Sequence, residues 1–346
     1  MRHLNRPTIK DVAREANVSI ATVSRILNKG VGYSEKTKQH VLETIEKMGY
    51  HPNAVARGLI NKKTDSIGVL FPNVSGLISA QILQGIEEVA QSHGISVIVC
   101  NTASDHKKTM DYLTFLQEKQ VDGLLFISQL LTKDYREFIK KMGVPIITIS
   151  AFSETNDVPY VKVDDEAASY DAVRYLIEKG HTDIGMISGP PTDPLTGHPR
   201  IQGYKRALRE ADLPFIETKV TWHKGFYFED GQVAFQKLLK SHPSITALFA
   251  ASDELAISAV SSAYHLGIRV PHQLSVIGYD DTKLAKMSIP PLTTVSQPFE
   301  EMGAQATKKL IDSIQSREPN TSLTMPHRIA ERESVKNRMA APNGHV

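Results

Sequence analysis

Two short helices joined by a tight turn are predicted by T-I-K-D-V-A-R-E-A-N-V-S-I-A-T-V-S-R-I-L-N, which runs from Thr8 to Asn28. Thr8 can cap the first helix, and Asp11, three residues later, completes a capping-box pattern. Asn17 tolerates the left-handed conformation that turns a chain sharply. Ser19 follows and can cap the second helix, so the local signals agree on a helix, a turn and a helix.

A third helix is predicted to start at Ser34. Its inward face would carry Val41, Leu42, Ile45 and Met48, which recur at helical spacing. Three short helices with a tight turn between the first two form a helix-turn-helix. In that motif the second helix enters the major groove of DNA by its N-terminal end.

The predicted second helix carries side chains suited to reading DNA. Ile20 and Ala21 would contact base edges, for instance a thymine methyl, and Arg25 could donate to a guanine. Short polar residues suited to phosphate contacts, which fix the register, are Ser19, Thr22, Ser24 and Asn28, and Thr8 is assigned to the same DNA surface. The local alternative is that Ser19 only caps the helix and Ile20 only packs.

Charge is divided unevenly along the chain. Residues 1–63 hold 12 Lys and Arg against 5 Asp and Glu, which gives +7, and the remaining residues sum to −5. A basic head on an acidic body indicates a polyanionic partner for the head. Charge alone is also compatible with a solvated basic face.

Composition excludes several other classes. The 346 residues allow two or three domains, and the single cysteine, Cys100, excludes an internal disulfide framework and a clustered cysteine metal site. No apolar run is long enough to span a membrane, and the start lacks the apolar core of a signal peptide. We therefore expect a cytoplasmic protein with no membrane partner.

Enzyme signatures are missing as well. The chain has no GK[ST] phosphate loop and no HExxH motif. The adjacent carboxylates Asp164–Asp165 and Asp280–Asp281 do not suggest an acid/base pair, because sequence neighbours usually point apart. The sequence predicts a protein that is not an enzyme and needs no metal or cofactor.

Short apolar strands alternate with amphipathic helices from Ser66 onward. The strand candidates are Ser66–Phe71, Ser96–Cys100, Gly123–Ile127, Pro145–Ile149, Asp183–Ser188, Ala247–Ala250 and Ser275–Gly278. The helix candidates include Ile78–His93, Lys107–Glu118, Ala167–Lys179, Gln202–Ala211 and Asp253–Leu266. This alternation predicts two α/β lobes, each a doubly wound parallel sheet, with a ligand cleft at the carboxyl ends of the strands.

The stretch from Thr8 to Asn28 resembles the signature of the LacI/GalR family of bacterial transcriptional regulators, with Asn17 where glycine is usual. The next stretch, G-Y-H-P-N-A-V-A-R-G-L, resembles the hinge helix of that family. The resemblance implies that Asn53 meets the DNA backbone, and that Ala56 and Leu59 lie in the minor groove. Leu59 would be the wedge inserted between base pairs.

Physical chemistry adds a mechanism for this hinge. From Asn53 to Asn61 it is too short to be a stable helix alone in water, and Gly58 weakens it further. It should therefore order only on DNA beside a partner hinge, so whatever separates two hinges releases the DNA. A plain tether, with Leu59 buried against the body, is the alternative.

The body resembles the family's effector domain, which is similar to periplasmic sugar-binding proteins, over residues 66–333. The markers are I-S-G-P at 187–190, R-I-Q-G-Y at 200–204, A-S-D-E-L-A at 251–256 and V-I-G-Y-D-D at 276–281. Arg200 offers a forked donor and Asp280 two acceptors, which suit sugar hydroxyls, and the alternative for both is a structural ion pair. The remaining effector-binding candidates are Ser150, Asp164, Phe226, Ser252 and Asp253, of which the last two could instead cap a helix and Phe226 could pack in the core.

Two departures from the family make the pocket smaller and less polar on one side. G-L-I-S at 76–79 stands where relatives often carry N-P-F-Y, and Ser150 stands where an acidic residue is common. The hinge and P-H-R-I at 326–329 resemble the carbon catabolite control subgroup, whose co-repressor is a phosphorylated carrier protein. In the segment 286–291, no basic residue follows Lys286, and the basic residue expected to bind a phosphoserine is missing. This favours a small-molecule effector.

The predicted organisation is a DNA-binding head at 1–50, a hinge helix and linker at 51–65, a two-lobed effector and dimerisation domain at 66–333, and a disordered tail at 334–346. The predicted function is a transcriptional regulator, and specifically a repressor, of carbohydrate metabolism. It would bind a palindromic double-stranded DNA operator as a homodimer under the control of a sugar or sugar-phosphate effector. The alternatives are control by a phosphorylated carrier protein, and a cytoplasmic sugar-binding protein with no role on DNA.

Overall fold

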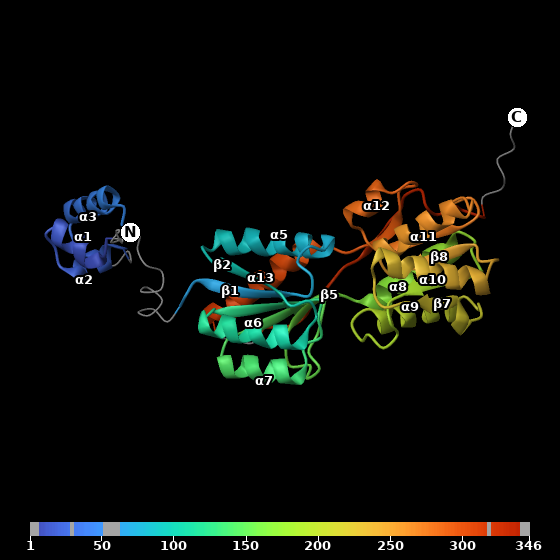
Figure 1. Ribbon diagram of the computed structural model, residues 1–346, viewed down its shortest axis with the longest axis horizontal. Helices are drawn as coiled ribbons and strands as arrows, with labels where there is room; N and C mark the ends of the chain where they lie inside the picture. The colour runs from blue at the N-terminus through green and yellow to red at the C-terminus, as the bar shows by residue number, and fades with distance from the viewer. Residues whose placement is uncertain (1–6, 28–30, 51–62, 317–319, 340–346) are drawn as a thin grey trace, which may run out of the picture. The chain divides into compact units, whose positions relative to one another are not determined.

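The computed structural model describes residues 7–27, 31–50, 63–316 and 320–339 (Figure 1). The chain divides into two compact units, Met1–Asp65 and Ser66–Val346. Across the described ranges, no helix is both long enough and apolar enough to cross a membrane.

The first unit contains the three predicted helices, α1 (Ile9–Glu15), α2 (Ile20–Leu27) and α3 (Glu35–Met48). The Asp11 carboxylate accepts from the backbone N–H of Thr8 at 2.9 Å and from its hydroxyl at 2.7 Å. Asn17 makes the turn with a φ of 50°. The hydroxyl oxygens of Ser19 and Ser34 accept backbone N–H bonds in the first turns of α2 and α3. The predicted capping box at Asp11, turn at Asn17, cap at Ser19 and helix start at Ser34 are confirmed.

The core of the first unit is small and lies between the three helices. Its buried residues are Val12, Ala13, Ala16, Val23, Ile26 and Val41. The predicted inward face of α3 is wrong at Leu42, which is 41% exposed, whereas Thr44 is buried and donates to the His40 carbonyl. Thr44 lies one turn after Val41 on the same face, and its hydroxyl can be buried because the helix itself accepts its hydrogen bond.

The second unit begins with a lobe built on a six-stranded parallel sheet in the order β11-β5-β4-β3-β1-β2. The strands are β1 (Ser66–Phe71), β2 (Ser96–Asn101), β3 (Gly123–Ile127), β4 (Ile146–Ile149), β5 (Tyr160–Val163) and β11 (Leu323–Met325). Its helices are α5 (Leu77–Ser92), α6 (His106–Glu118), α7 (Lys133–Met142) and α13 (Phe299–Ser316). Apolar residues of α5 and α13 cover one face of the sheet, and those of α6 and α7 cover the other (Figure 1).

The second lobe has a sheet in the order β12-β10-β9-β8-β6-β7, parallel except for β12. The strands are β6 (Ile184–Ser188), β7 (Val220–Trp222), β8 (Ala247–Ala250), β9 (Ser275–Asp280), β10 (Thr293–Ser296) and β12 (Arg328–Ala330). Its helices are α8 (Asp165–Glu178), α9 (Gly197–Glu210), α10 (Phe228–Ser241), α11 (Asp253–His265) and α12 (Lys283–Met287), with a 3-10 turn, η1, at Glu217–Lys219. The predicted architecture of two doubly wound α/β lobes is confirmed.

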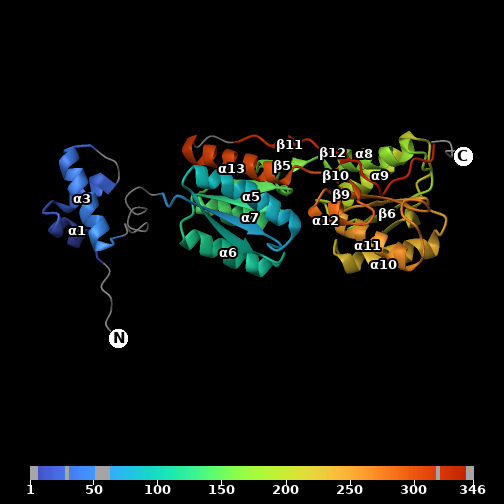
Figure 2. The same cartoon turned by 90° about the horizontal axis from the view of Figure 1, so that it is seen from above.

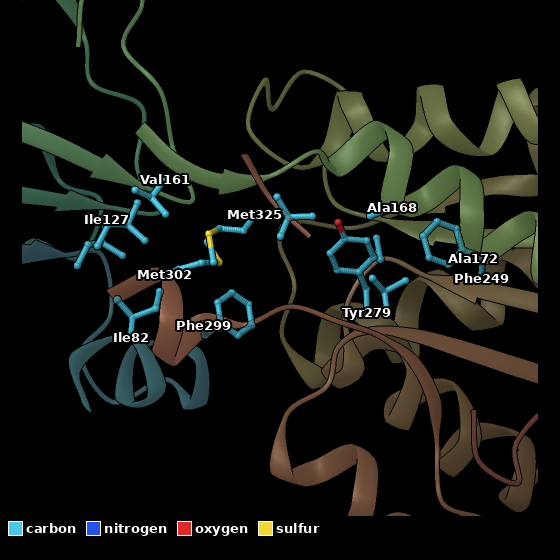
Figure 3. Close-up of a cluster of buried hydrophobic side chains, with 14 of the residues drawn as sticks. Ile82, Ile127, Val161, Ala168, Ala172, Phe249, Tyr279, Phe299, Met302 and Met325 are labelled. Carbon is cyan, nitrogen blue, oxygen red and sulfur yellow. The ribbon is translucent and has the colours of Figure 1, made fainter. Parts of the chain in front are cut away.

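The chain passes between the lobes three times. It crosses after β5, after β10 and between β11 and β12, as Figure 2 shows from above. One apolar cluster continues through these crossings, where Phe299 and Met302 of the first lobe approach Tyr279 and Ala168 of the second (Figure 3). The lobes therefore share a core at the point where the chain crosses.

The predicted disordered tail is wrong for residues 334–339, which pack on the second lobe. Ser334 is fully buried, and its hydroxyl donates to the Val276 carbonyl and accepts from the backbone N–H of Thr293. The buried His181 ring donates to the Lys336 carbonyl at 3.1 Å. Polar composition suggested a tail without structure, but these residues are held by long-range hydrogen bonds. Residues 340–346 lie outside the described part of the chain.

Candidate functional site

A cavity of about 430 Å³ lies between the two lobes of the second unit. The carboxyl ends of strands from both sheets open onto it, as expected for doubly wound sheets. Its volume falls in the range of small-molecule sites. Five of the predicted effector residues line it, namely Ser150, Arg200, Phe226, Ser252 and Asp280, and two do not, Asp164 and Asp253.

Arg200 on α9 is the buried cation of the cavity. Its side chain is 6% exposed, and its Nε and Nη2 donate to Oδ1 of Asp165 at 3.0 and 2.9 Å. Its Nη1 donates to the Ala251 carbonyl, and the guanidinium lies 3.8 Å from the centre of the Tyr279 ring. Burial opposes the charge, but Tyr279, Asp165 and Asp280 together hold the pKa of Arg200 above its ordinary value.

Sequence reasoning missed two residues that belong to this site, Asp165 and Lys162. Asp165, at the start of α8, is buried between the two cations, because its Oδ2 lies 3.1 Å from Nζ of Lys162. The Tyr279 hydroxyl also donates to Asp165, at 3.2 Å. The sequence offers two adjacent carboxylates here, Asp164 and Asp165, and does not distinguish between them.

Asp164 has a structural role and does not line the cavity. It is exposed, and its carboxylate caps α8 by accepting from the backbone N–H groups of Glu166 and Ala167 at 3.1 and 3.0 Å. Asp164 and Asp165 therefore point apart, as predicted for neighbouring carboxylates. Asp164 therefore caps the helix, and Asp165 forms the ion pairs at the cavity.

Asp280 is the buried acid of the cavity. It is 3% exposed, adopts a φ of 118°, and accepts a hydrogen bond from the Gln297 amide at 2.8 Å. Burial raises the pKa of Asp280 well above its usual range, and the charge of Asp253 adds to this, against the opposing effects of Arg200 and Gln297. Its neighbour Asp281 points elsewhere and pairs with Arg332.

Asp253 is buried and does not line the cavity, unlike most of the predicted effector residues. Its Oδ2 accepts from the backbone and the hydroxyl of Thr282 at 2.6 and 2.9 Å, and its Oδ1 accepts from the Thr294 hydroxyl at 2.6 Å. The side chain therefore connects the N-terminus of α12 to β10. Ser252, the preceding residue, caps α11 and lines the cavity, so both of its proposed roles are compatible with its position.

Asp253 should also give the stability of the second unit a distinct pH dependence. Burial raises its pKa to about 6, so the folded chain holds this proton at pH values where the unfolded chain has lost it. Its contribution to stability is therefore complete below pH 3.8 and declines as the pH rises through 6. Urea unfolding of the Asp253→Asn variant should show a shallower decline than the parent, by an amount on the order of 2 kcal/mol between pH 4 and pH 7. Asp280, whose pKa is also raised, accounts for the decline that remains. Parallel pH profiles in both proteins would contradict the assignment.

Phe226 combines the two roles that its position suggested. Its ring lines the cavity, packs against the apolar clusters of the second lobe, and has its centre 6.0 Å from the Arg200 guanidinium. Gly189 permits this placement, because a Cβ there would lie 2.3 Å from the ring. The first lobe adds Leu77 and Ile78 to the lining, so the departure at 76–79 contributes apolar surface.

The second candidate site is the outer face of α2 in the first unit. Ile20 is 45% exposed and Ala21 and Arg25 are exposed, whereas Val23 and Ile26 are buried. This separation places the predicted base-contacting residues away from the core. Thr8 and Ser19 are exposed and Thr22 and Ser24 are half-buried. The predicted DNA-contact residues Asn28, Asn53, Ala56 and Leu59 lie outside the described residues.

Comparison with known proteins identifies the first unit. Residues 8–53 match the family model for bacterial regulatory proteins of the lacI family, and residues 173–335 match a periplasmic binding protein-like domain. The chain is 40% identical over 331 residues to catabolite control protein A of Priestia megaterium, across 95% of this chain and 99% of that protein. The chain belongs to the lacI family of bacterial regulatory proteins.

Solved structures of lacI-family proteins share the whole architecture. The lac repressor dimer bound to operator and the anti-inducer ONPF matches with a TM-score of 0.87 and 26% identity, over 96% of this chain and all of that one. The complex of the transcriptional regulator CelR with cellobiose matches with a TM-score of 0.74 and 30% identity, over 95% and 100%. This lacI-family chain is a transcriptional regulator with a DNA-binding head, as its sequence predicts, and the members of the family are regulators rather than enzymes.

Proposed function

We propose that this regulator is a repressor that binds a palindromic operator as a homodimer and responds to a small sugar-like effector in the interlobe cavity. The observation that supports the effector most directly is the buried Arg200–Asp165 pair, which lines a cavity of about 430 Å³ together with Asp280. A forked donor, a carboxylate acceptor and the ring of Phe226 are the groups that recognise a polyhydroxylated ring.

The DNA side of the proposal rests on α2. One helix reads only a few base pairs, so two heads on two half-sites supply the specificity that one head lacks. Ile20, Ala21 and Arg25 would read base edges, while Thr8, Ser19, Thr22, Ser24 and Asn28 would fix the register on phosphates. For the hinge, the resemblance supports contacts by Asn53, Ala56 and Leu59 in the minor groove.

Ligand closure of the lobes would change the spacing of the two hinges and so the affinity for DNA. By linkage, operator DNA must change the effector affinity by the same factor. The two lobes are separately packed and are joined at the three crossings by one shared apolar cluster. Closure of the lobes about these crossings is the kind of movement that could change the spacing of the hinge helices.

Fluorescence anisotropy with a labelled pool of palindromic operators tests this proposal, at several salt concentrations and with a panel of sugars and sugar phosphates. We expect tight, salt-sensitive, sequence-selective binding that at least one sugar changes, and weaker DNA bending by the Leu59→Ala variant. Selective binding that no sugar alters would contradict the effector. No selective binding at all would contradict the operator and favour a sugar-binding protein without a DNA role.

The resemblance of residues 326–329 to the carbon catabolite control subgroup supports a second form of control, by a phosphorylated carrier protein. The same anisotropy assay separates the two. A phosphorylated carrier protein that raises operator affinity, with no response to any sugar, would replace the small-molecule effector with a protein co-repressor.

Substitutions on the exposed face of α2 should alter selectivity without altering stability. Ile20→Ser and Arg25→Gln are each expected to lower the ratio of specific to nonspecific binding about 10-fold or more, because each removes a base contact. Lys47→Gln is the matched control, since Lys47 is an exposed cation in the last turn of α3, as Arg25 is in α2. If Lys47→Gln and Arg25→Gln lowered the ratio of specific to nonspecific binding equally, Arg25 would contribute only its charge and no base contact.

A further inference from the structure

The first lobe presents a row of polar residues to the cavity. Asn73 follows β1, Ser128 follows β3, Ser150 follows β4, and Lys162 lies on β5; all four line the cavity. The sheet order β5-β4-β3-β1 makes these strands neighbours, so the four residues follow one another along a single edge. We call Lys162, Ser150 and Ser128 the first-lobe wall.

Charge is distributed unequally between the two sides of the cavity. Among the described residues that line it, the acids are Asp165, Asp193, Glu254 and Asp280, and every one belongs to the second lobe. Lys162 is the one charged residue that the described first lobe contributes. The acid in contact with the first-lobe wall is Asp165, and it is paired with both Lys162 and Arg200.

Lys162 is held so that its ammonium keeps a donor for the cavity. Its side chain is 17% exposed, Nζ donates to the Val163 carbonyl at 2.9 Å, and Nζ lies 3.1 Å from Asp165. An ammonium carries three N–H groups, so these two partners leave one. Asp165 is already neutralised by Arg200, which leaves the charge of Lys162 incompletely balanced.

Ser150 supplies an independent observation. Its Oγ is buried and has no hydrogen-bond partner within the described part of the chain. A buried hydroxyl without a partner is uncommon in folded proteins and marks a place where another group completes the bond. Ser128 and Ser150 also share a left-handed backbone, with φ of 48° and 50°, an unusual conformation that recurs at functional sites.

We propose that the first-lobe wall is a subsite for an oxyanion, a carboxylate or a phosphate, on the effector. Lys162 supplies the positive charge, and the hydroxyls of Ser128 and Ser150 supply further donors. The second lobe then holds the hydroxyl groups of the same ligand through Arg200 and Asp280. The inference rests on the proposed function and deepens it, since it makes the effector an acidic or phosphorylated polyol.

The test uses small anions as probes, so that it does not depend on knowing the sugar. The full-length protein is titrated with inorganic phosphate and, separately, with acetate to 50 mM at constant ionic strength, and thermal unfolding of the second unit is followed through its single tryptophan, Trp222. Ligand that binds the folded state raises the unfolding temperature in a saturable way. We expect saturation by at least one anion in the millimolar range.

Variants separate the cavity from the basic head, which also attracts phosphate. Lys162→Met should weaken the anion at least 10-fold, and Ser150→Gly, which suits the left-handed backbone, should weaken it several-fold. Lys219→Met is the matched control: its ammonium is similarly buried, 14% exposed, and is paired with Asp183. An anion effect that is absent, or that Lys162→Met leaves unchanged, would overturn the subsite.

Glucose, gluconate and glucose 6-phosphate then identify the source of the oxyanion in the operator assay. Gluconate acting alone indicates a carboxylate, and glucose 6-phosphate acting alone indicates a phosphate. A response to glucose stronger than to either anion would overturn the subsite while leaving the proposed function intact. Anion binding sensitive to Lys162→Met, without any change in operator affinity, would instead support the subsite and contradict the effector role.

Discussion

Replacing Arg200 with methionine is expected to destabilise the second unit by about 3 kcal/mol and to abolish its response to effector. The substitution leaves Asp165, which is 8% exposed at its side chain, with Lys162 as its only cation, and breaking one side of a buried ion pair is strongly unfavourable. It also removes the forked donor from the cavity. Urea unfolding followed through Trp222 measures the loss, because this tryptophan lies in the second lobe.

Arg206→Met provides the matched control on the same helix. Arg206 is 32% exposed and pairs with Glu166 at 3.0 Å and Glu210 at 3.9 Å, so its loss should cost less than about 1 kcal/mol. Operator affinity without effector should be unchanged in both variants. If the two arginine variants had equal stability, the buried pair would not contribute more than a surface pair, and the assignment of Arg200 would be wrong.

Gly85→Ala is the second substitution with a large expected effect. Helices α5 and α13 approach so closely that a Cβ on Gly85 would lie 1.9 Å from the carbonyl oxygen of Glu300, and one on Gly303 would lie 2.2 Å from that of Ile82. The helices would have to separate, and this repacking should cost about 3 kcal/mol, more than the helix propensity that alanine returns.

Gly76→Ala is the control for this prediction. Gly76 has a φ of −69°, and the nearest atom to an added Cβ is 3.6 Å away, so alanine fits without rearrangement. Unfolding midpoints in urea should fall for Gly85→Ala and stay within about 0.5 kcal/mol of the parent for Gly76→Ala. A Gly85→Ala protein as stable as the parent would show that α5 and α13 can move apart at little cost.

Local signals made the first unit predictable from sequence. Capping by Asp11, the left-handed turn at Asn17 and the caps at Ser19 and Ser34 each act within four residues, so the sequence alone contains them. The strongly apolar strands of the second unit were predictable for a similar reason, and all seven are present with ends shifted by two residues or fewer.

Elements stabilised by distant partners were missed. Strand β5, Y-V-K-V, contains Lys162, whose charge is compensated by Asp165 in the other lobe, and β10, T-T-V-S, is buried because Thr294 donates to Asp253. Neither segment therefore shows the apolar pattern that predicts a strand. Helix α9 begins at Gly197, five residues before the predicted start, since Pro199 fits in a first helical turn.

The same distinction explains the site residues. Arg200, Asp253 and Asp280 all stand in sequence motifs, but only Arg200 and Asp280 line the cavity, because Asp253 is held by Thr282 and Thr294. A strand end predicts which edge of the sheet a residue occupies, but not whether its carboxylate meets a helix N-terminus or a cleft. Only the fold shows that Asp165, rather than Asp164, faces Arg200.

The three crossings also constrain how the chain is assembled during synthesis. The first lobe takes α13 and β11, residues 299–325, from a part of the chain made after nearly all of the second lobe. Its sheet edge beside β5 and the face under α13 therefore stay uncovered until the ribosome has passed residue 325. The first lobe is therefore completed only after most of the second lobe has been made, so a nascent chain halted near residue 290 would expose apolar surface that the finished protein buries.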